Sequence, residues 1–116
     1  MSRLPTNPDA RPVLKLPPIH PGEILADELA ELGLSANALA RALDVPANRI
    51  SEIVAGRRAV SADTALRLAH YFGTTARFWL NLQLSHDLAV TERDHGEAIA
   101  EAVRPRGGWE SRPGKS

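Results

Sequence analysis

Three side chains within five residues could read the edges of DNA bases: the amide of Asn48, the guanidinium of Arg49 and the carboxylate of Glu52. Asparagine pairs bidentately with adenine, arginine pairs bidentately with guanine, and glutamate accepts a hydrogen bond from cytosine. Ile50 and Ile53 lie among them at the i, i+3 spacing of one helix face. With the isoleucines turned inward, the outward face of such a helix consists of Ala47, Asn48, Arg49, Ser51 and Glu52. We therefore expect this face to contact bases.

A second short helix and a tight turn precede this one. Ser35 is a favourable N-cap because its hydroxyl can accept a hydrogen bond from an amide of the first turn, and we expect a helix over residues 36–43. Pro46 lacks an amide donor and disfavours helical geometry at the residue before it. The first helix therefore ends near Asp44, a residue type that tolerates a left-handed backbone. A helix of about eight residues follows Pro46 and ends at Gly56.

The stretch 35–58 thus has the order of a DNA-binding helix-turn-helix unit. In that docking mode the second helix enters the major groove and flanking basic residues lie on the phosphates. The stretch holds four arginines and two acidic residues, whereas residues 20–34 hold four acidic residues and no lysine or arginine. A plain pair of amphipathic helices in an all-α bundle is the alternative, and spacing alone does not separate the two. Arg57 and Arg58, directly after the glycine, favour DNA.

The stretch before this unit predicts a helix that starts at Pro21, where the missing amide donor costs nothing. Gly33 closes it as a left-handed residue, and His20 flanks its start. Its apolar stripe consists of Ile24, Leu25, Leu29 and Leu32. Its opposite face is acidic and consists of Asp27, Glu28 and Glu31. Such a face is most often simply solvated, and docking of a basic partner protein is the functional alternative.

Two more helices are expected after the helix-turn-helix unit. Ser61 caps a helix that stops at Gly73, and either Thr74 or Thr75 caps the next one, over residues 76–89. Four or five helices with glycine stops make an all-α compact domain. We place this domain at residues 19–103, between a proline-rich arm (1–18) and a basic tail (104–116) that we expect to be flexible.

The last predicted helix is apolar on two sides. Phe78 and Leu82 fall on one side with Trp79 near them, and a second stripe, spaced by four residues, consists of Leu80, Leu84 and Leu88. Because a helix that is apolar on opposite faces is buried on both, we expect the second stripe to form a homodimer interface. The alternative is that the segment after Glu92 folds back over it.

Composition excludes several classes of protein. The 116 residues have no net charge and no cysteine, so a disulfide framework or a thiolate metal site is excluded. No run of 18 apolar residues and no signal region occur, so we expect a cytoplasmic protein without a membrane span. The four histidines show no metal-ligand spacing, and no nucleotide-binding or nucleophile motif is present. We expect no enzyme activity, no cofactor and no metal.

Three segments carry a family resemblance: PIHPGEIL (18–25), LSANALARAL (34–43) and VPANRISEIVAGRRAVSADTALRLAHYFGTTARFWLNLQ (45–83). They resemble the HigA-type antitoxins of the lambda-repressor-like (Xre) helix-turn-helix class, and the likeness covers about residues 17–103. The resemblance implies a DNA-binding domain of five to six helices that dimerises through its C-terminal helices. It also implies repression of the antitoxin's own operon and neutralisation of a HigB-type toxin, a RelE-like ribosome-dependent mRNA endonuclease.

The resemblance also assigns contact residues. For bases these are Ala47, Asn48, Arg49, Ser51 and Glu52, and for the DNA backbone they are Ser35, Arg41, Arg57 and Arg58. The sequence departs from the family pattern at the turn, where Asp44 replaces the usual glycine. It also departs at Ala47, which offers only a methyl group and therefore limits readout there to thymine methyls.

Two other functions fit the same residues. One is a stand-alone repressor without a toxin partner, and the other is a protein-interaction module whose DNA affinity is vestigial. For a toxin, the acidic face of Asp27, Glu28 and Glu31 and the proline-rich arm are the two candidate docking sites.

Overall fold

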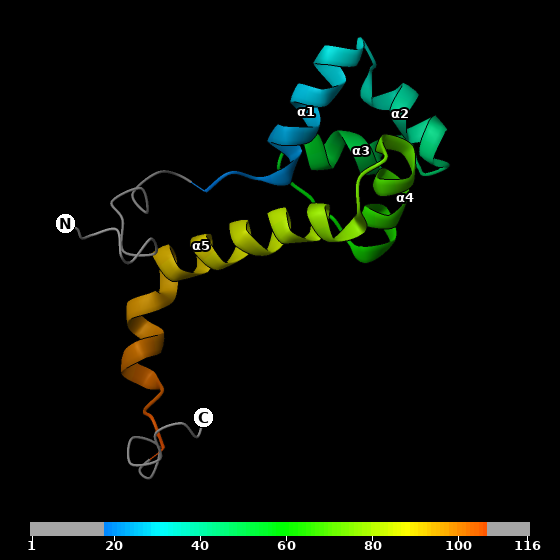
Figure 1. Ribbon diagram of the computed structural model, residues 1–116. Coiled ribbons are helices and arrows are strands. Elements are labelled where there is room, and N and C mark those ends of the chain that lie inside the picture. Colours follow the sequence, from blue (N-terminus) through cyan, green and yellow to red (C-terminus); the bar gives the residue numbers. More distant parts are fainter. Residues whose placement is uncertain (1–17, 107–116) are drawn as a thin grey trace, which may run out of the picture. The chain divides into compact units, whose positions relative to one another are not determined.

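The computed structural model describes residues 18–106. They form α1 (Pro21–Leu32), α2 (Ala36–Leu43), α3 (Ala47–Val54), α4 (Ala62–Phe72) and α5 (Ala76–Ala102), and no strand occurs among them (Figure 1). The predicted all-α class and the helix-turn-helix order are confirmed. The chain divides into two compact units between His86 and Asp87. The first holds α1–α4 and the start of α5, and the described part of the second holds the remainder of α5.

Local capping determines where the helices begin. The Nδ1 atom of His20 accepts the Gly22 amide at 2.8 Å while Glu23 Oε2 accepts the His20 amide at 3.2 Å, which is a reciprocal capping box. Ser35 and Ser61 cap α2 and α4 as predicted. At α5 the structure decides between the two threonines: Thr75 Oγ1 accepts the Phe78 amide at 3.0 Å.

The turn between α2 and α3 depends on Asp44. Its backbone is left-handed, with φ 60° and ψ 50°, and the described part of the chain has no other non-glycine residue with a positive φ. This conformation lets the Val45 amide donate to the Ala40 carbonyl at 3.0 Å and the Asp44 amide donate to the Arg41 carbonyl at 3.1 Å. The two bonds satisfy carbonyls at the end of α2. The left-handed turn at Asp44 is confirmed.

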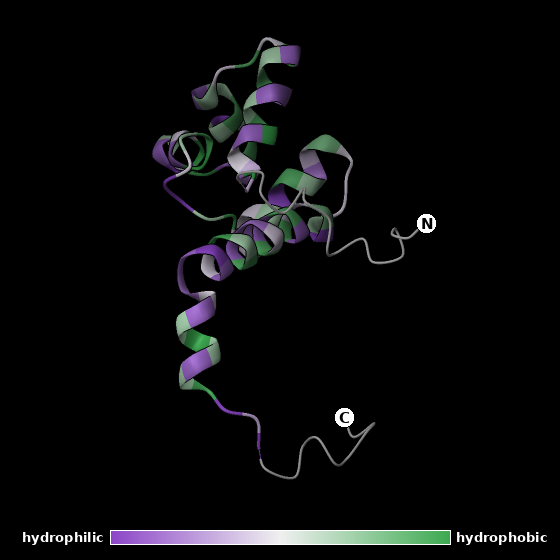
Figure 2. Cartoon of the chain, turned by 90° about the vertical axis from the view of Figure 1, so that its left-hand side faces the viewer, coloured by the Kyte–Doolittle hydropathy of each residue, from purple (hydrophilic) through white to green (hydrophobic). Residues whose placement is uncertain are grey.

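The core is formed where α3 packs against α1 and α2, and α2 packs against α4 (Figure 1). Hydrophobic and hydrophilic residues are interspersed along the helices (Figure 2). The buried apolar residues are Leu25, Leu29, Leu39, Ala40, Leu43, Ile50, Ile53, Val60, Ala65, Leu68 and Trp79. Ile50 and Ile53 are fully buried, which places the remaining side of α3 outward.

The start of α5 packs differently from the prediction. Trp79 and Gln83, four residues apart, are its buried residues, whereas Phe78 is 43% exposed. The Trp79 indole donates to Thr74 Oγ1 at 2.9 Å, and Gln83 Oε1 accepts the buried Val60 amide at 2.7 Å. The expectation that both apolar sides are buried is therefore wrong for Phe78, because Trp79 and Gln83 take the buried positions, while Leu82 is half-buried against the core.

The predicted end of this helix was also wrong, since α5 continues to Ala102 instead of stopping at residue 89. Residues after Glu92 thus belong to the same helix. Leu80 is half-buried against the core, while Leu84 and Leu88 are 56% and 60% exposed. Their place in a dimer interface stays a prediction. Most of the predicted arm and tail (1–17 and 107–116) lies outside the described residues.

Candidate nucleic-acid interface

The polar side of α3 is open to solvent. Ala47, Asn48 and Ser51 are exposed, and Arg49 and Glu52 are half-buried. The opposite side is held in the core by Ile50 and Ile53. The five side chains predicted to contact bases therefore share one outward surface, which we call the α3 polar face.

Ser51 and Asn48 differ in whether their side chains are already hydrogen-bonded. The Ser51 hydroxyl donates back to the Asn48 carbonyl at 3.3 Å, so it is turned toward its own helix. In the part of the chain that the structure describes, the Asn48 side-chain amide makes no hydrogen bond. Its donor and acceptor are therefore available for a bidentate contact with adenine.

Arg49 is held by an acidic residue of the next helix. Its Nη1 atom lies 3.1 Å from Asp63 Oδ2, and the Arg49 side chain is 29% exposed. The Nε atom of Arg67 lies 2.9 Å from the same oxygen. The hydrogen bond from Arg67, with smaller contributions from the charges of Arg67 and Arg49, holds the pKa of Asp63 below its usual value. Asp63 is therefore ionised at neutral pH.

Arg67 also reaches the end of α2. Its Nη1 atom donates to the Leu43 carbonyl at 2.8 Å and to the Asp44 carbonyl at 3.3 Å. These carbonyls lie at the C-terminus of a helix, where a cation is favoured. A chain of contacts thus runs from the turn, through Arg67 and Asp63, to Arg49 on the α3 polar face.

Glu52 and Arg58 form a second ion pair on this face. The Nε and Nη2 atoms of Arg58 both lie 2.8 Å from Glu52 Oε1. The chain reverses at Gly56 (φ 81°), where the Arg57 amide donates to the Glu52 carbonyl at 2.8 Å, and this reversal returns residue 58 to α3. The sequence indicated separate contacts, a base for Glu52 and a phosphate for Arg58, but in the free protein the two side chains bind each other. Exposed pairs of this kind are weak.

The residues expected at the DNA backbone are exposed. Arg41 and Arg57 make no ion pair among the described residues. The Ser35 hydroxyl accepts the Ala38 amide at 3.0 Å, which leaves it at the N-terminus of α2. Arg57 is the third residue after the end of α3.

A surface pocket of about 450 Å³ lies beside the α3 polar face. Its charged lining consists of Asp44, Arg49, Arg58, Asp63 and Arg67. Three arginines against two aspartates make it a polar, net basic hollow rather than an apolar ligand pocket of the usual kind. Sequence reasoning missed Asp63 and Arg67 as site residues. The i, i+4 spacing of an acid and a base on one predicted helix was the signal that could have found them.

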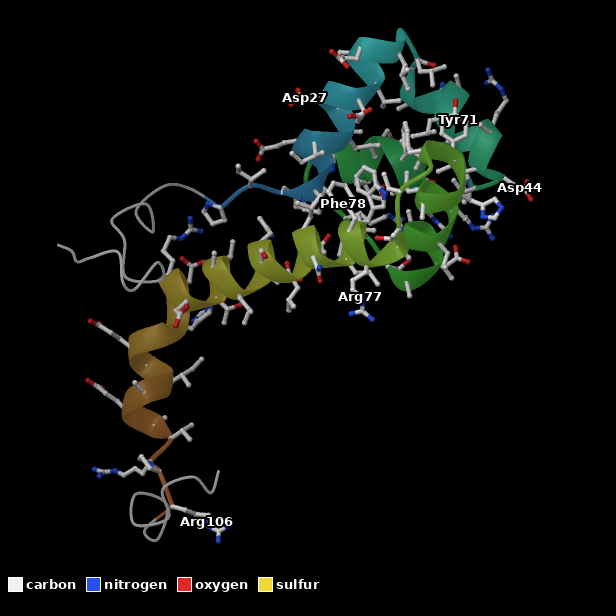
Figure 3. All side chains as sticks on the ribbon, viewed as in Figure 1. Asp27, Asp44, Tyr71, Arg77, Phe78 and Arg106 are labelled. Atoms are coloured by element: carbon white, nitrogen blue, oxygen red, sulfur yellow. The ribbon has the colours of Figure 1, made fainter. Side chains whose placement is uncertain are left out.

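The acidic face of α1 is also exposed. Asp27, Glu28 and Glu31 are all at the surface and make no ion pair within the described residues. Figure 3 shows Asp27 on α1 and Asp44 at the end of α2. Leu32, which the sequence placed in the apolar stripe, is 54% exposed at the end of the same helix.

Residues 18–106 hold no group of three or more side chains suited to a metal ion. None of their helices has the length and apolar character needed to cross a membrane.

Comparison with known sequences gives one family and several close relatives. A family model described as Helix-turn-helix matches residues 25–79. Virulence-associated protein I of Dichelobacter nodosus is 56% identical over 81 residues, which are 69% of this chain and 75% of that protein. Antitoxin HigA-1 of Vibrio cholerae is 37% identical over 89 residues, which are 76% of this chain and 83% of that protein.

Comparison with solved structures gives the same fold. An addiction module antidote protein of the HigA family from Coxiella burnetii is 51% identical, with a TM-score of 0.75 over 78% of this chain and 100% of that chain. The Pseudomonas aeruginosa antitoxin HigA, solved with the higBA promoter, is 49% identical, with a TM-score of 0.73 over 76% of this chain and 97% of that chain.

Proposed function

The chain belongs to the HigA family of helix-turn-helix, DNA-binding antitoxins, and from this membership we propose that it binds the operator of its own operon, represses that operon and neutralises a HigB-type toxin. The proposal assigns it no catalytic step. A repressor of its own operon acts where the DNA is, so we place it in the cytoplasm.

The observation that carries the DNA-binding part is the division of α3 into a fully buried apolar side and an open polar side. A helix whose polar side faces solvent and whose N-terminus follows a tight turn can enter a major groove. Asn48 and Arg49 are our first choices for base readout. Arg41, Arg57, Arg58 and Ser35 are the proposed backbone contacts.

Footprinting on the upstream DNA tests this proposal. The purified full-length chain should protect a defined site in the DNA upstream of its own gene. Unrelated DNA of the same length and base composition serves as the control. Equal affinity for both DNAs, or no protection, would contradict operator binding.

We propose a homodimer as the DNA-bound form. Leu84 and Leu88 support it because they are large, apolar and exposed, and a two-fold dimer would set two α3 helices about one turn of duplex apart, near 34 Å. Leu84→Glu with Leu88→Glu should give a monomer in sedimentation equilibrium with an unchanged helical spectrum. Arg77→Glu, at an exposed position of α5 (Figure 3), is the control. A dimer that survives the double change would exclude this interface.

For toxin neutralisation we propose docking on the acidic face of α1. Its three exposed carboxylates would complement a basic ribonuclease, since opposite charge across an interface steers association. The proline-rich arm is the second candidate.

Binding of the product of the adjacent gene separates these two docking sites. Asp27→Lys with Glu31→Lys should weaken toxin affinity, whereas deletion of residues 1–17 should not. The reverse result would assign docking to the arm. Unchanged affinity in both variants would exclude both, and no binding by the wild-type chain would favour a stand-alone repressor.

A further inference from the structure

We propose that Asp63 is a positioning residue for DNA readout: it holds the Arg49 guanidinium in the orientation that contacts a base and is itself fixed by Arg67 to the turn between α2 and α3. This inference rests on the proposed operator binding and deepens it. Asp63 lies on α4, outside the helix-turn-helix unit, and is not itself proposed to contact DNA.

The first step is that Asp63 is well anchored. It is the second residue of α4, whose start is fixed by the Ser61 hydroxyl accepting the Thr64 amide at 3.2 Å. Its side chain is short, and its Oδ2 atom accepts from Arg67 at 2.9 Å. Because Arg67 also donates to the Leu43 carbonyl at 2.8 Å, the carboxylate is tied to two elements at once.

The second step is that Arg49 needs such an anchor. An arginine side chain has several rotatable bonds and loses their freedom when it forms a specific contact. The 3.1 Å contact between Arg49 Nη1 and Asp63 Oδ2 restricts the guanidinium before any DNA is bound. Less freedom is then left to lose at the moment of binding.

The third step is that the contact leaves the reading edge open. Asp63 accepts a hydrogen bond only from the Nη1 atom of Arg49. Within the described residues the Nε and Nη2 atoms of Arg49 make no hydrogen bond. A guanidinium offers its donors in a planar fork, and guanine is read by two parallel hydrogen bonds. Asp63 can therefore orient the fork without occupying it.

Asp63 could instead weaken DNA binding by neutralising Arg49, and its removal would then change DNA affinity differently. If Asp63 only neutralised Arg49, its removal would raise affinity for every DNA sequence, because a negative charge near the phosphates would be gone. If Asp63 positions Arg49, its removal lowers discrimination at one base pair, whatever happens to the overall affinity. The ratio of two affinities therefore distinguishes the roles.

The experiment measures this ratio in the wild-type chain and in four variants. The two DNAs are the footprinted operator and the same operator changed at the base pair where Arg49→Ala loses discrimination. Asp63→Asn, which keeps the shape but not the charge, and Asp63→Ala should each reduce the ratio about threefold to tenfold. The double variant Arg49→Ala with Asp63→Ala should discriminate no less than Arg49→Ala alone, because the two residues act as one unit.

The matched control is Asp94→Asn, which breaks an exposed ion pair with Arg93 on α5, a helix with no proposed base contact, and should leave the ratio unchanged. Asp63→Glu, which keeps the charge, should restore part of the discrimination that Asp63→Ala loses. Circular dichroism and the melting temperature show whether each variant is folded. If Asp63→Ala does not fold, Asp63→Asn still tests the proposal.

Three results would overturn the inference. The first is wild-type discrimination in Asp63→Asn and Asp63→Ala, which would leave the proposed operator binding intact. The second is an unchanged base preference in Arg49→Ala, which would mean that Arg49 does not read a base. Absence of any footprint by the wild-type chain would overturn the proposed function itself, and the inference with it.

Discussion

Most charged side chains around the α3 polar face are paired before DNA is present. Arg49 is bound to Asp63, and Glu52 is bound to Arg58. Because both pairs are at the surface, each is worth little in stability. The Glu52–Arg58 pair can be exchanged for a contact of Arg58 with a phosphate, whereas Arg49 can keep Asp63 on Nη1 and still offer Nε and Nη2 to a base. Asn48 is different, since its amide makes no hydrogen bond in the described part of the chain. DNA binding is therefore expected to exchange partners at Arg58, and to add contacts at Asn48 and Arg49.

Glu52→Gln tests this exchange at the second pair. The change removes a carboxylate from the α3 polar face and frees Arg58 for a phosphate. We expect affinity to rise for operator and unrelated DNA alike, and the plot of log affinity against log salt to steepen by about one. Titrations at several salt concentrations measure both. Weaker operator binding with a changed base preference would contradict this and assign Glu52 to cytosine readout.

At the scale of single residues, the exposure of Ala47, Asn48 and Ser51 could be predicted because a helical repeat divides α3 into two sides. The ion pairs could not be predicted, since Arg49–Asp63 and Glu52–Arg58 depend on how α4 and the loop after Gly56 return to α3. Each pair joins residues that are separate in the sequence, and only the fold brings them together.

At the scale of helices, local signals gave most boundaries. Ser35, Ser61 and Gly33 act through bonds within a few residues, so the sequence was sufficient to place them. The end of α5 could not be placed because residues 90–102 show no regular apolar stripe. The buried position of Gln83 was missed because its partner, the Val60 amide, comes from a loop 23 residues earlier in the chain.

Gln83→Leu tests that contact. Loss of the acceptor leaves the buried Val60 amide without its hydrogen bond, and a buried unsatisfied donor costs about 1–3 kcal/mol. We expect the free energy of unfolding to fall by this amount in urea denaturation. Asn81→Leu, at an exposed position of the same helix, should change it little. Equal stability of the two variants would show that the contact contributes nothing.

Gly22→Ala tests the packing of α1 on α3. A Cβ atom at this position would overlap the backbone carbonyl oxygen of Ile53, which cannot rotate away. We expect a loss of about 1–3 kcal/mol in stability, as for other overpacked sites. Gly96→Ala in α5 is the control, because the nearest atom there is the flexible Glu92 side chain at 3.3 Å. It should be neutral or stabilising by up to about 1 kcal/mol. A stabilised Gly22→Ala variant would mean that the two helices are further apart.

At the scale of the molecule, charge is separated along the chain although the net charge is zero. The helix-turn-helix unit is basic, and α1 carries exposed acids. A chain without net charge gains little from long-range attraction to DNA. Its affinity must therefore come from a few local contacts, which makes the contribution of each arginine measurable.

Arg57→Ala tests the contribution of one arginine to DNA affinity. Arg57 is exposed, follows the end of α3 and is proposed to contact a phosphate. Its removal should lower the affinity for all DNA sequences about equally. It should also reduce the slope of log affinity against log salt by about one. Operator and unrelated DNA are titrated in parallel at several salt concentrations. A selective loss of operator binding would contradict a phosphate contact.

The central claim is that the α3 polar face reads bases in the major groove. The most direct test compares wild type with Asn48→Ala and Arg49→Ala on the footprinted operator and on its single-base variants. Each change should cost about 1–3 kcal/mol of discrimination, confined to one base pair. Unchanged operator affinity and unchanged base preference in both variants would contradict the claim.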